Sequence, residues 1–391
     1  MEITKDIRYI GVDDHDIDLF EGQYDVSENG MAYNSYVILG DKIAVADSVD
    51  AGFVDEWLGN LEAALDGRTP DYLVVHHMEP DHSAGIAAFM ERYPQAQIVA
   101  SMGAFRMMVN YFGTDYPERK IVVKEGDVLD LGGHSLTFIG APNVHWPEVI
   151  FSYESTDKVL FSADGFGKFG ANDIEDPEGW ACEARRYYFG IVGKFGKFVQ
   201  AVLKKAADLD IQIICPLHGP VWRKDLGWFI EKYDTWSRYA PETQGVLIVY
   251  ASMYGNTENA AQALAASLCD KGMSKVAMYD VSSTHVSQLI SEAFKYSHIV
   301  LASVTYNLGI YPAMHDFLMD MKALNLQNRT FAIIENGSWA VKSGDLMQKF
   351  VNDELKNMTV LNERLSLASS MGTDKRTELE ALADAILESM K

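Results

Sequence analysis

Short apolar runs separated by polar turn residues fill the first part of the chain. They alternate with turns between Ala32 and Val49, and runs of strand length recur near residues 72, 97, 120, 136, 159 and 211. Segments with helical spacing of apolar residues lie between them, notably Ser83–Tyr93 and Phe195–Leu209. Short apolar runs indicate buried strands, and a 3.6-residue period indicates helices. This part therefore predicts one mixed α/β domain of about 240 residues, a length that single domains of this class reach.

The pattern changes after residues 236–245, which close a helical stretch with Pro241 and Gly245. From there five units of strand, loop and helix follow one another, and the last helix covers Thr377–Met390. Strands that alternate with helices predict a parallel, doubly wound sheet. We expect two domains, 1–243 and 244–391, with the strands of the second domain at Val246–Tyr250, Lys275–Tyr279, His298–Ser303, Thr330–Ile334 and Met358–Leu361.

The 391 residues carry a formal net charge of -23, and no local cluster of Lys and Arg interrupts this acidity. Nucleic-acid and membrane partners are disfavoured, because phosphate backbones and anionic lipid surfaces would gain no attraction from such a chain. The charged stretch Met1–Tyr9 offers no apolar signal segment, and no later run has the length of a membrane span, so we expect a cytoplasmic protein. The three cysteines form no CxxC pair, which excludes a disulfide framework and a rubredoxin-like iron site in this sequence. We expect Cys182, Cys215 and Cys269 all to be buried as small apolar residues.

Seven side chains that can bind metals follow the apolar runs of the first domain. Four lie on the single turn 77–82, after the run Tyr72–Val75, and each of the other three comes just beyond another apolar run. A lone histidine is more often a hydrogen-bonded core residue, but seven ligands at corresponding places argue against that interpretation for the set. They are too many for one tetrahedral zinc and suit two metals that share a carboxylate. The predicted ligands are His77, Glu79, Asp81, His82, His145, Asp164 and His218.

A turn rich in hydroxyl and amide groups follows the first strand of the second domain and leads into a helix; it holds Ser252, Met253, Tyr254, Gly255, Asn256 and Thr257. Hydroxyls and backbone N–H groups at a helix start can hold a phosphate without a lysine, although the same residues also suit an ordinary helix cap. The turn contains neither G-x-G-x-x-G nor G-x-x-x-x-G-K-[ST], so a monophosphate is favoured over a dinucleotide or a nucleoside triphosphate.

Two further loops at strand ends combine a glycine, an aromatic residue and polar groups, which is what clamping a flat ring system requires. Their candidate residues are Thr305, Tyr306, Asn307 and Gly309 in one loop, and Asn336, Gly337, Ser338 and Trp339 in the other. Together the three loops resemble those of flavodoxin. That resemblance implies bound FMN and a strand order of 2-1-3-4-5, with Tyr306 and Trp339 as candidates for contact with the flavin ring.

The metal-binding turn resembles that of the metallo-β-lactamase superfamily, in which a His-x-His-x-Asp-His sequence is followed by a distant His, Asp and His. Glu79 replaces the second histidine here, and the resulting His-x-Glu-x-Asp-His pattern resembles that of flavodiiron proteins. An added carboxylate favours iron over zinc. The resemblance implies an N-terminal αββα metallo-β-lactamase-like sandwich followed by a doubly wound, flavodoxin-like domain. It also implies two irons: one bound by His77, Glu79 and His145, the other by Asp81, His82 and His218, with Asp164 as the bridge and with His82 turned away in some relatives.

The same resemblance implies an oxidoreductase, typical of anaerobes, that reduces dioxygen to water, nitric oxide to nitrous oxide, or both. FMN would relay electrons from an external donor, a rubredoxin or a reduced deazaflavin, within a head-to-tail homodimer or a dimer of dimers. Tyr24 and Trp146 are candidates for a place behind the iron ligands, and a plain core role is as good an interpretation of either. Two alternatives stay open: a zinc hydrolase of the metallo-β-lactamase kind with a fused flavodoxin module, and an electron carrier whose metal site is structural or empty.

Overall fold

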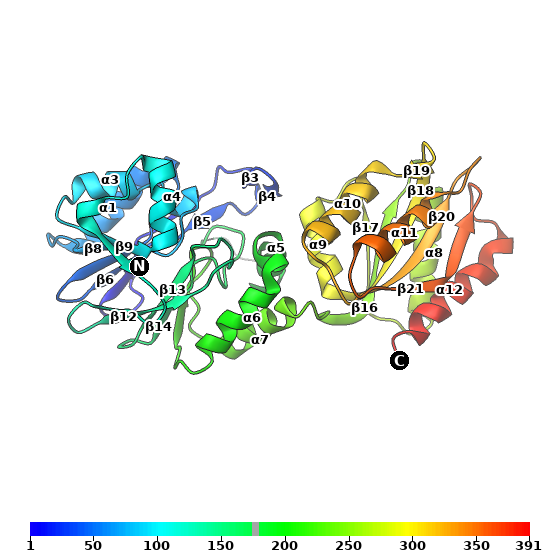
Figure 1. Cartoon of the computed structure of the whole chain (residues 1–391). Coiled ribbons are helices and arrows are strands. Elements are labelled where there is room, and N and C mark those ends of the chain that lie inside the picture. The colour runs from blue at the N-terminus through cyan, green and yellow to red at the C-terminus, as the bar shows by residue number, and fades with distance from the viewer. Residues whose placement is uncertain (174–179) are drawn as a thin grey trace. The chain divides into compact units, whose positions relative to one another are not determined.

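A computed structural model describes residues 1–173 and 180–391 of the chain. It divides into two compact units, Met1–Asp234 and Thr235–Lys391 (Figure 1). The first strand of the second unit begins at Thr243.

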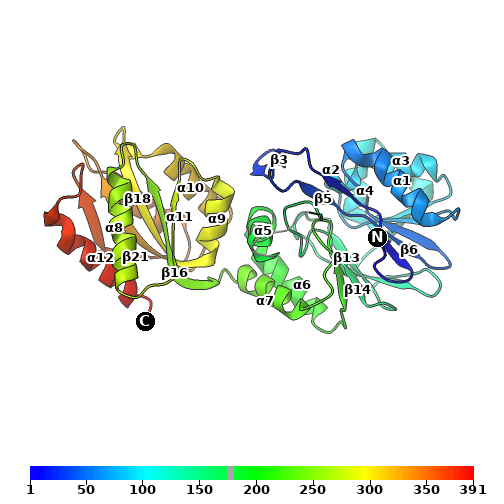
Figure 2. The same cartoon turned by 180° about the vertical axis from the view of Figure 1, so that it is seen from behind.

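The first unit contains two β-sheets packed face to face with helices outside them (Figures 1 and 2). The first sheet has the strand order β1-β6-β7-β8-β9-β10, with strands at Ile7–Tyr9, Tyr36–Leu39, Ile43–Ala46, Tyr72–Val75, Gln97–Ser101 and Lys120–Val123. The second has the order β11-β12-β13-β14-β15, with strands at Val128–Asp130, Ser135–Gly140, Ile150–Glu154, Val159–Phe161 and Ile213–Cys215. This is the predicted αββα sandwich, and every apolar run singled out in this half of the sequence forms a strand or leads into one.

Helices α1 (Val54–Leu65), α3 (Ile86–Arg92) and α4 (Met102–Phe112) cover the outside of the first sheet, whereas α5 (Trp180–Tyr187), α6 (Gly196–Ala206) and α7 (Leu226–Ser237) lie beside the second. The short helix α2 (Pro80–Ser83) follows β8. Two small antiparallel pairs complete the unit: β2 (Val12–Asp14) with β5 (Met31–Tyr33), and β3 (Leu19–Phe20) with β4 (Tyr24–Asp25).

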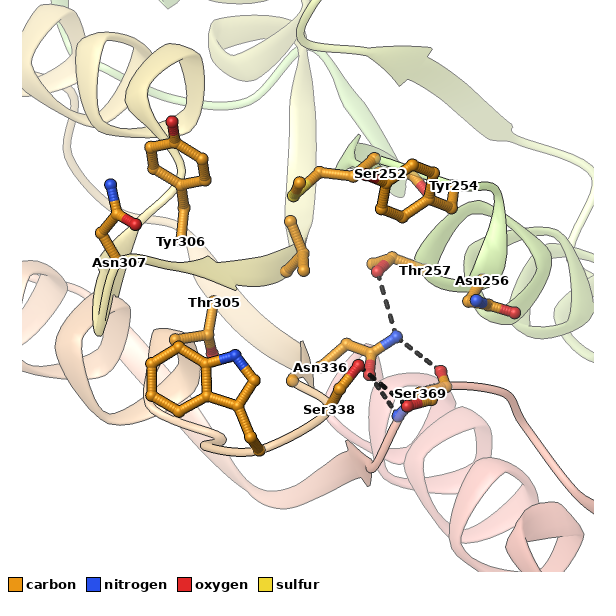
Figure 3. A pocket seen from close by; sticks show the side chains of 14 residues that line it. Ser252, Tyr254, Asn256, Thr257, Thr305, Tyr306, Asn307, Asn336, Ser338 and Ser369 are labelled. Atoms are coloured by element: carbon orange, nitrogen blue, oxygen red, sulfur yellow. Dashed lines mark hydrogen bonds between the residues drawn. The ribbon is translucent and has the colours of Figure 1, made fainter.

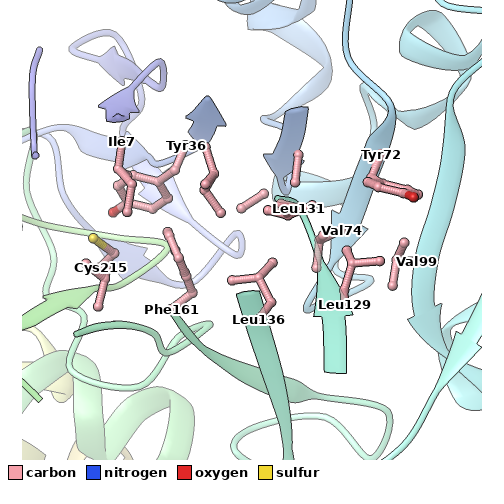
Figure 4. Packing of buried hydrophobic residues seen from close by; sticks show 14 of the residues in the cluster. Ile7, Tyr36, Tyr72, Val74, Val99, Leu129, Leu131, Leu136, Phe161 and Cys215 are labelled. Carbon is pink, nitrogen blue, oxygen red and sulfur yellow. The ribbon is translucent and has the colours of Figure 1, made fainter. Parts of the chain in front are cut away.

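The core of this unit lies between its two sheets (Figure 4). Tyr36 and Val74 of the first sheet meet Leu136, Phe161 and Cys215 of the second, and all five are buried. Removing apolar surface from water is the main favourable term in such a core. Because this packing fixes both sheets, the loops at their strand ends are held at defined positions.

The second unit contains a five-stranded parallel sheet in the order β17-β16-β18-β20-β21. In chain order this is 2-1-3-4-5, which confirms the predicted doubly wound topology. The strands are Thr243–Ala251 (β16), Val276–Asp280 (β17), Tyr296–Tyr306 (β18), Thr330–Asn336 (β20) and Thr359–Leu367 (β21), and β19 (Gly309–Ile310) pairs with the end of β18. Helices α8 (Asn256–Asp270) and α12 (Arg376–Glu388) pack together on one face, and α9 (Val286–Lys295), α10 (Pro312–Ala323) and α11 (Ser343–Glu354) lie on the other (Figure 2).

The structure corrects one expectation about the cysteines. Cys215 is buried at the end of β15, but Cys182 is only half-buried and Cys269 is exposed. Cys269 lies in the last turn of α8, whose buried residues Leu264 and Leu268 occupy the opposite, sheet-facing side. Within residues 1–173 and 180–391 there is no helix both long and apolar enough to cross a lipid bilayer.

Candidate metal centre and cofactor cavity

The seven predicted metal ligands gather where the strands of the two sheets of the first unit end. Strand β8 leads directly to His77 and Glu79, and the short helix α2 carries Asp81 and His82. The other three ligands come from loops that follow β12, β14 and β15, namely His145, Asp164 and His218. The structure brings all seven together in two groups, one of His77, Glu79, His145 and Asp164, the other of Asp81, His82 and His218.

In the first group the ligand atoms surround a common point. The Nε2 atoms of His77 and His145 lie 3.3 Å apart, and Glu79 Oε2 lies 3.2 Å and 2.9 Å from them. Asp164 Oδ2 lies 3.2 Å from His77 Nε2 and 3.1 Å from His145 Nε2. Metal–nitrogen bonds of about 2.1 Å at tetrahedral or octahedral angles put neighbouring ligand atoms about 3.0–3.4 Å apart, so these spacings suit one metal ion.

The second group repeats this arrangement on the other side of Asp164. His82 Nε2 lies 2.9 Å from His218 Nε2, and each of these atoms lies 3.3 Å from Asp81 Oδ2. Asp164 Oδ1 lies 3.5 Å from His82 Nε2 and 3.7 Å from His218 Nε2. One oxygen of Asp164 thus faces each group, as a carboxylate that bridges two metals would. His82 points into the group in this structure.

The cluster buries negative charge that a cation would neutralise. Asp81 and Asp164 are buried, yet neither oxygen of either carboxylate has a hydrogen-bond partner among the described residues. Buried carboxylates in such a position are costly unless a positive charge pairs with them. Burial by itself would lower the pKa of His145, but Asp164 and Glu79 outweigh it and raise that pKa to about 9. The donor set of imidazoles and carboxylates therefore fits two divalent metals.

A residue that the sequence pattern did not reveal, Glu148, fixes one of the ligands. Its Oε1 accepts hydrogen bonds from His77 Nδ1 at 2.8 Å and from the backbone N–H of Met78 at 2.9 Å. Histidines that bind metals commonly donate their second ring N–H to a carboxylate or carbonyl, which sets the tautomer and the ring orientation. His218 follows the same rule, since its Nδ1 lies 2.7 Å from the carbonyl oxygen of Ala32. His82 Nδ1 has no such partner among the described residues.

His76 and Trp146 are next to ligands in the sequence but differ in their relation to the centre. His76 lies outside the cluster, because its Nδ1 pairs with Asp47 at 2.6 Å and its Nε2 with Ser152 at 2.7 Å. The ring of Trp146 packs edge-on against His77 at 5.2 Å and lies 6.0 Å from His145. The candidate Trp146 is therefore in direct contact with two ligands.

Tyr24 lies one layer further out than Trp146. Its hydroxyl donates to the carbonyl oxygen of Gly190 at 2.9 Å, and its ring packs on Phe169. Phe169 packs on Phe20, whose ring lies 5.3 Å from that of His218. Tyr24 thus supports an aromatic wall of the centre, and Phe20, Tyr33 and Tyr187 are rings of this wall that pack on His218.

A second candidate site lies in the other unit, at the carboxyl ends of its parallel strands (Figure 3). Ligands bind at this edge in open α/β sheets. The cavity has a volume of about 280 Å³, and twelve of the fourteen predicted cofactor contacts line it; only Gly255 and Gly309 do not. Its lining is Ser252, Met253, Tyr254, Asn256, Thr257, Val304, Thr305, Tyr306, Asn307, Asn336, Gly337, Ser338, Trp339 and Ser369.

Gly255 and Gly309 have conformational roles beside the cavity. Gly255 precedes α8 with a left-handed φ of 84°, and its N–H donates to Ser252 Oγ at 3.1 Å. Gly309 follows Asn307 and Leu308, both of which have left-handed φ angles, in the turn between β18 and β19. Gly255 therefore shapes its loop through its own left-handed backbone, whereas in the turn before Gly309 the left-handed angles belong to Asn307 and Leu308.

The loop after β20 approaches its own backbone closely. A Cβ at Gly337 would lie 1.9 Å from the carbonyl oxygen of Ala340, which no side chain can tolerate. The far end of this loop is attached to the neighbouring strand, since Thr305 Oγ1 accepts from the N–H groups of Lys342 at 2.9 Å and Ser343 at 3.1 Å. The indole of Trp339 is 78% exposed, so one face is open to a ligand in the cavity or to solvent.

Ser369 lines the cavity although nothing in the pattern around it marked it as a candidate. It belongs to the loop after β21, and that strand continues to Leu367, past the predicted end at Leu361. The polar residues Asn362, Glu363 and Arg364 hid the continuation, because they lie on an edge strand where side chains can face solvent.

Comparison with known proteins agrees with both sites. Residues 31–219 match the family described as ODP family beta lactamase, and residues 248–372 match the family described as Flavodoxin. The chain is 32% identical to a protein of Moorella thermoacetica named nitric oxide reductase, over 90% of this chain and 89% of that one. It is 31% identical to an uncharacterized protein of Methanocaldococcus jannaschii, over 83% of this chain and 82% of that one.

Solved structures share the whole architecture. The rubredoxin oxygen:oxidoreductase of Desulfovibrio gigas superimposes with a TM-score of 0.91 at 26% identity, covering 100% of this chain and 98% of that one. The flavodiiron protein of Giardia intestinalis, at 24% identity, has the same fold with a TM-score of 0.92 over 100% of this chain and 97% of that one. These relatives match both halves of the sequence: the sandwich with its two ligand groups and the flavodoxin-like sheet with its cavity. The chain therefore belongs to the flavodiiron protein family.

Proposed function

We propose that this protein reduces dioxygen, nitric oxide or both at a pair of irons, using FMN to relay electrons from an external donor. The observation that carries the proposal is the arrangement of seven ligands in two groups that share Asp164, in one chain with a flavodoxin-type cavity. The names of the relatives support it: one is called a nitric oxide reductase and another a rubredoxin oxygen:oxidoreductase.

In this proposal His77, Glu79 and His145 hold one iron, Asp81, His82 and His218 hold the other, and Asp164 joins them. Three carboxylates in the set favour a hard metal such as Fe(II) over zinc. When bound, two ferrous ions supply open positions for a small gas and electrons for its reduction. Glu148 keeps the lone pair of His77 Nε2 directed at the centre by accepting the Nδ1 proton. Trp146 and Phe20 give the centre apolar walls beside the ligands.

The cavity of the second unit would hold FMN. The turn 252–257 offers hydroxyl and amide donors at the start of α8 for the phosphate, and Tyr306 and Trp339 offer rings for contact with the flavin. FMN supplies one-electron steps that link a two-electron donor to two irons. Dioxygen takes up four electrons and four protons to give two waters, whereas two nitric oxide molecules take up two electrons and two protons to give nitrous oxide and one water.

The donor is proposed to be a rubredoxin or a reduced deazaflavin. The proposed assembly is a head-to-tail homodimer or a dimer of dimers, in which the flavin of one chain serves the irons of its partner. A monomer that turned over as fast as the oligomer would contradict this assembly.

The test is anaerobic stopped-flow turnover of purified protein with its iron, zinc and flavin quantified. Reduced rubredoxin and reduced deazaflavin are supplied separately, against dioxygen and against nitric oxide. About two irons and one FMN per chain with gas consumption would support the proposal, and the faster gas would name the main substrate. Zinc with hydrolysis of esters, thioesters or lactams, and no gas consumption, would favour the hydrolase instead.

A pair of aspartate variants separates catalysis from electron carriage. Asp164→Ala removes the bridge and is expected to abolish gas reduction while FMN stays bound. Asp210→Ala is the matched control, because Asp210 pairs with Lys158 on the surface of the same unit. Equal gas reduction by both variants would show that the reaction does not need the bridging carboxylate, and no gas reduction by the wild-type protein would point to an electron carrier whose metal cluster has no catalytic part.

A further inference from the structure

Asn336 occupies a central position among the loops of the flavin cavity. It ends β20, its side chain is 3% exposed, and it lies between the start of α8 and the loop after β21 (Figure 3). Its Nδ2 lies 3.3 Å from Thr257 Oγ1 and 2.8 Å from the carbonyl oxygen of Ser369, and its Oδ1 lies 3.0 Å from the backbone nitrogen of Ser369. The side chain therefore joins three separate segments of the chain.

The partners of Asn336 fix which way its amide points. A backbone N–H can only donate, so the atom that faces the nitrogen of Ser369 must be the amide oxygen. The carbonyl oxygen of Ser369 can only accept, so the atom that faces it must be the amide NH₂. The NH₂ group is consequently the one that faces Thr257, and Thr257 Oγ1 accepts a hydrogen bond from it.

This bond determines where the proton of Thr257 goes. Thr257 lies in the first turn of α8, lines the cavity and is 2% exposed. Its hydroxyl donates to no residue that the structure describes, and its oxygen already accepts from Asn336. The hydroxyl proton is thus left for a ligand in the cavity.

The charge of the cavity makes this proton important. Among the described residues that line it there is no Lys, Arg or His. A bound phosphate must be held by neutral donors at the start of the helix, and hydrogen bonds to a charged acceptor are the strong ones. A threonine hydroxyl turned the wrong way would present a lone pair to the phosphate in place of a proton.

We infer that Asn336 is a positioning residue that directs the hydroxyl proton of Thr257 at the phosphate of FMN, and that Ser369 holds Asn336 in the orientation this requires. The inference rests on the proposed binding of FMN. It assigns a specific task to the loop 368–372: the backbone N–H and carbonyl of Ser369 fix the orientation of the side-chain amide of Asn336. It also makes phosphate recognition separable from recognition of the flavin ring.

The variant that tests this is Asn336→Asp in the full-length protein. The new carboxylate keeps an oxygen for the N–H of Ser369 but can donate neither to Thr257 nor to the carbonyl oxygen of Ser369. The threonine would therefore donate its proton to that carboxylate and turn its lone pairs to the cavity. The added negative charge would also repel the phosphate. We expect the Kd for FMN to rise about 100-fold or more, since hydrogen bonds to charged groups are strong and like charges add to the loss. Riboflavin has no phosphate for the carboxylate to repel or for Thr257 to bind, so its Kd should change by less than about threefold.

Two further variants complete the experiment. Thr257→Val removes the hydroxyl and should weaken FMN about 10- to 100-fold with little effect on riboflavin. Asn259→Asp is the matched control for charge, because Asn259 lies in the same turn of α8 but is exposed and outside the cavity. It should bind both flavins within about threefold of the wild type.

The measurement is quenching of flavin fluorescence on titration of the flavin-free protein with FMN and with riboflavin. Loss of FMN affinity with riboflavin binding retained, in both Asn336→Asp and Thr257→Val, supports the inference. Parallel loss of both flavins in Asn336→Asp would mean that Asn336 only assembles the loops, and unchanged FMN affinity in either variant would also overturn the inference. A wild-type protein that binds neither flavin would instead refute the proposed flavin function.

Discussion

Substitution of Glu148 tests whether the metal centre depends on a residue that binds no metal. The Glu148 side chain is 1% exposed and accepts from His77 Nδ1 at 2.8 Å and from Met78 N–H at 2.9 Å. Glu148→Gln keeps an oxygen in this position, removes the charge and places an NH₂ group where the second carboxylate oxygen has no hydrogen-bond partner among the described residues. Glu148→Leu removes both acceptors and leaves His77 free to rotate about its ring axis or to change its tautomer.

The expected losses follow from the strength of these bonds. A hydrogen bond to a charged group contributes about 1.5–3 kcal/mol, which corresponds to about a 10- to 100-fold loss of iron affinity for the leucine variant. A neutral bond has about half that strength, so the glutamine variant should lose about 5- to 10-fold. We expect iron affinity to decrease in the order wild type, Glu148→Gln, Glu148→Leu. A purely steric role for Glu148 would instead leave the iron affinity of the near-isosteric glutamine variant unchanged.

Iron affinity is measured by competition with a chelator of known strength, with FMN content as an internal reference. The matched control is Glu154→Gln: Glu154 is also fully buried and accepts from a histidine, His134 Nδ1 at 3.1 Å, and from the N–H of Thr156 at 2.9 Å. It belongs to neither of the two ligand groups, but with His134 and Asp157 it forms a third set of side chains that could hold a metal ion, so the iron content of this control is quantified as well. Iron binding by Glu148→Leu within about twofold of Glu154→Gln would refute the orienting role of Glu148, since at least a tenfold loss is expected.

Three further outcomes are expected. Removal of the metals by a chelator should lower the unfolding temperature of the first unit by about 5–10 °C. Ligand binding at 100 times Kd stabilises a protein by about 2.7 kcal/mol, and each kcal/mol shifts the unfolding temperature of a unit of this size by about 2–4 °C. Calorimetry that shows no shift would mean that the cluster is stable without cations. Burial lowers the pKa of His298 from 6.5 to about 4, so the unfolded chain takes up the proton first as the pH falls. The free energy of unfolding of the second unit in urea should therefore fall by about 1–2 kcal/mol between pH 6.5 and pH 4, and His298→Gln should abolish that loss. Gly337→Ala should weaken FMN binding at least about tenfold, because the added Cβ collides with Ala340 and displaces the loop; FMN titration with wild-type affinity would show that the loop can relax.

Much of the metal centre could be predicted because its ligands obey a simple positional rule. His145, Asp164 and His218 each follow an apolar run, and the structure shows these runs as β12, β14 and β15, neighbouring parts of one sheet. Strand ends that share a sheet edge must converge, whatever the length of chain between them. The ligand turn after β8 belongs to the other sheet, and the packing of the two sheets brings it to the same place.

The end of the last strand could not be predicted from the hydrophobic pattern. The last strand was expected to stop at Leu361, but backbone pairing with β20 continues to Leu367. Hydrophobic patterning detects burial, and an edge strand can form all its backbone hydrogen bonds while its side chains stay polar. The consequence is specific: the loop that carries Ser369 was not recognised as part of the cavity.

Glu148 and Asn336 show a more general limit of sequence reasoning. Glu148 holds a ligand that lies 71 positions away, and Asn336 holds Thr257 from a distance of 79 positions. Asn336 was predicted as a contact for the cofactor; it lines the cavity, and its amide is in addition directed at other protein groups. A residue that binds a ligand must have suitable chemistry at a strand end, and both of those properties can be read along the chain. A residue that orients one of these binding residues is identified by the loops that lie next to it and by which of its atoms donates and which accepts a hydrogen bond. Only the folded structure supplies that information. For this reason the variants that best test the two proposed sites are substitutions of the orienting residues, where a near-isosteric change alters the donors, acceptors and charge while the side chain keeps its size.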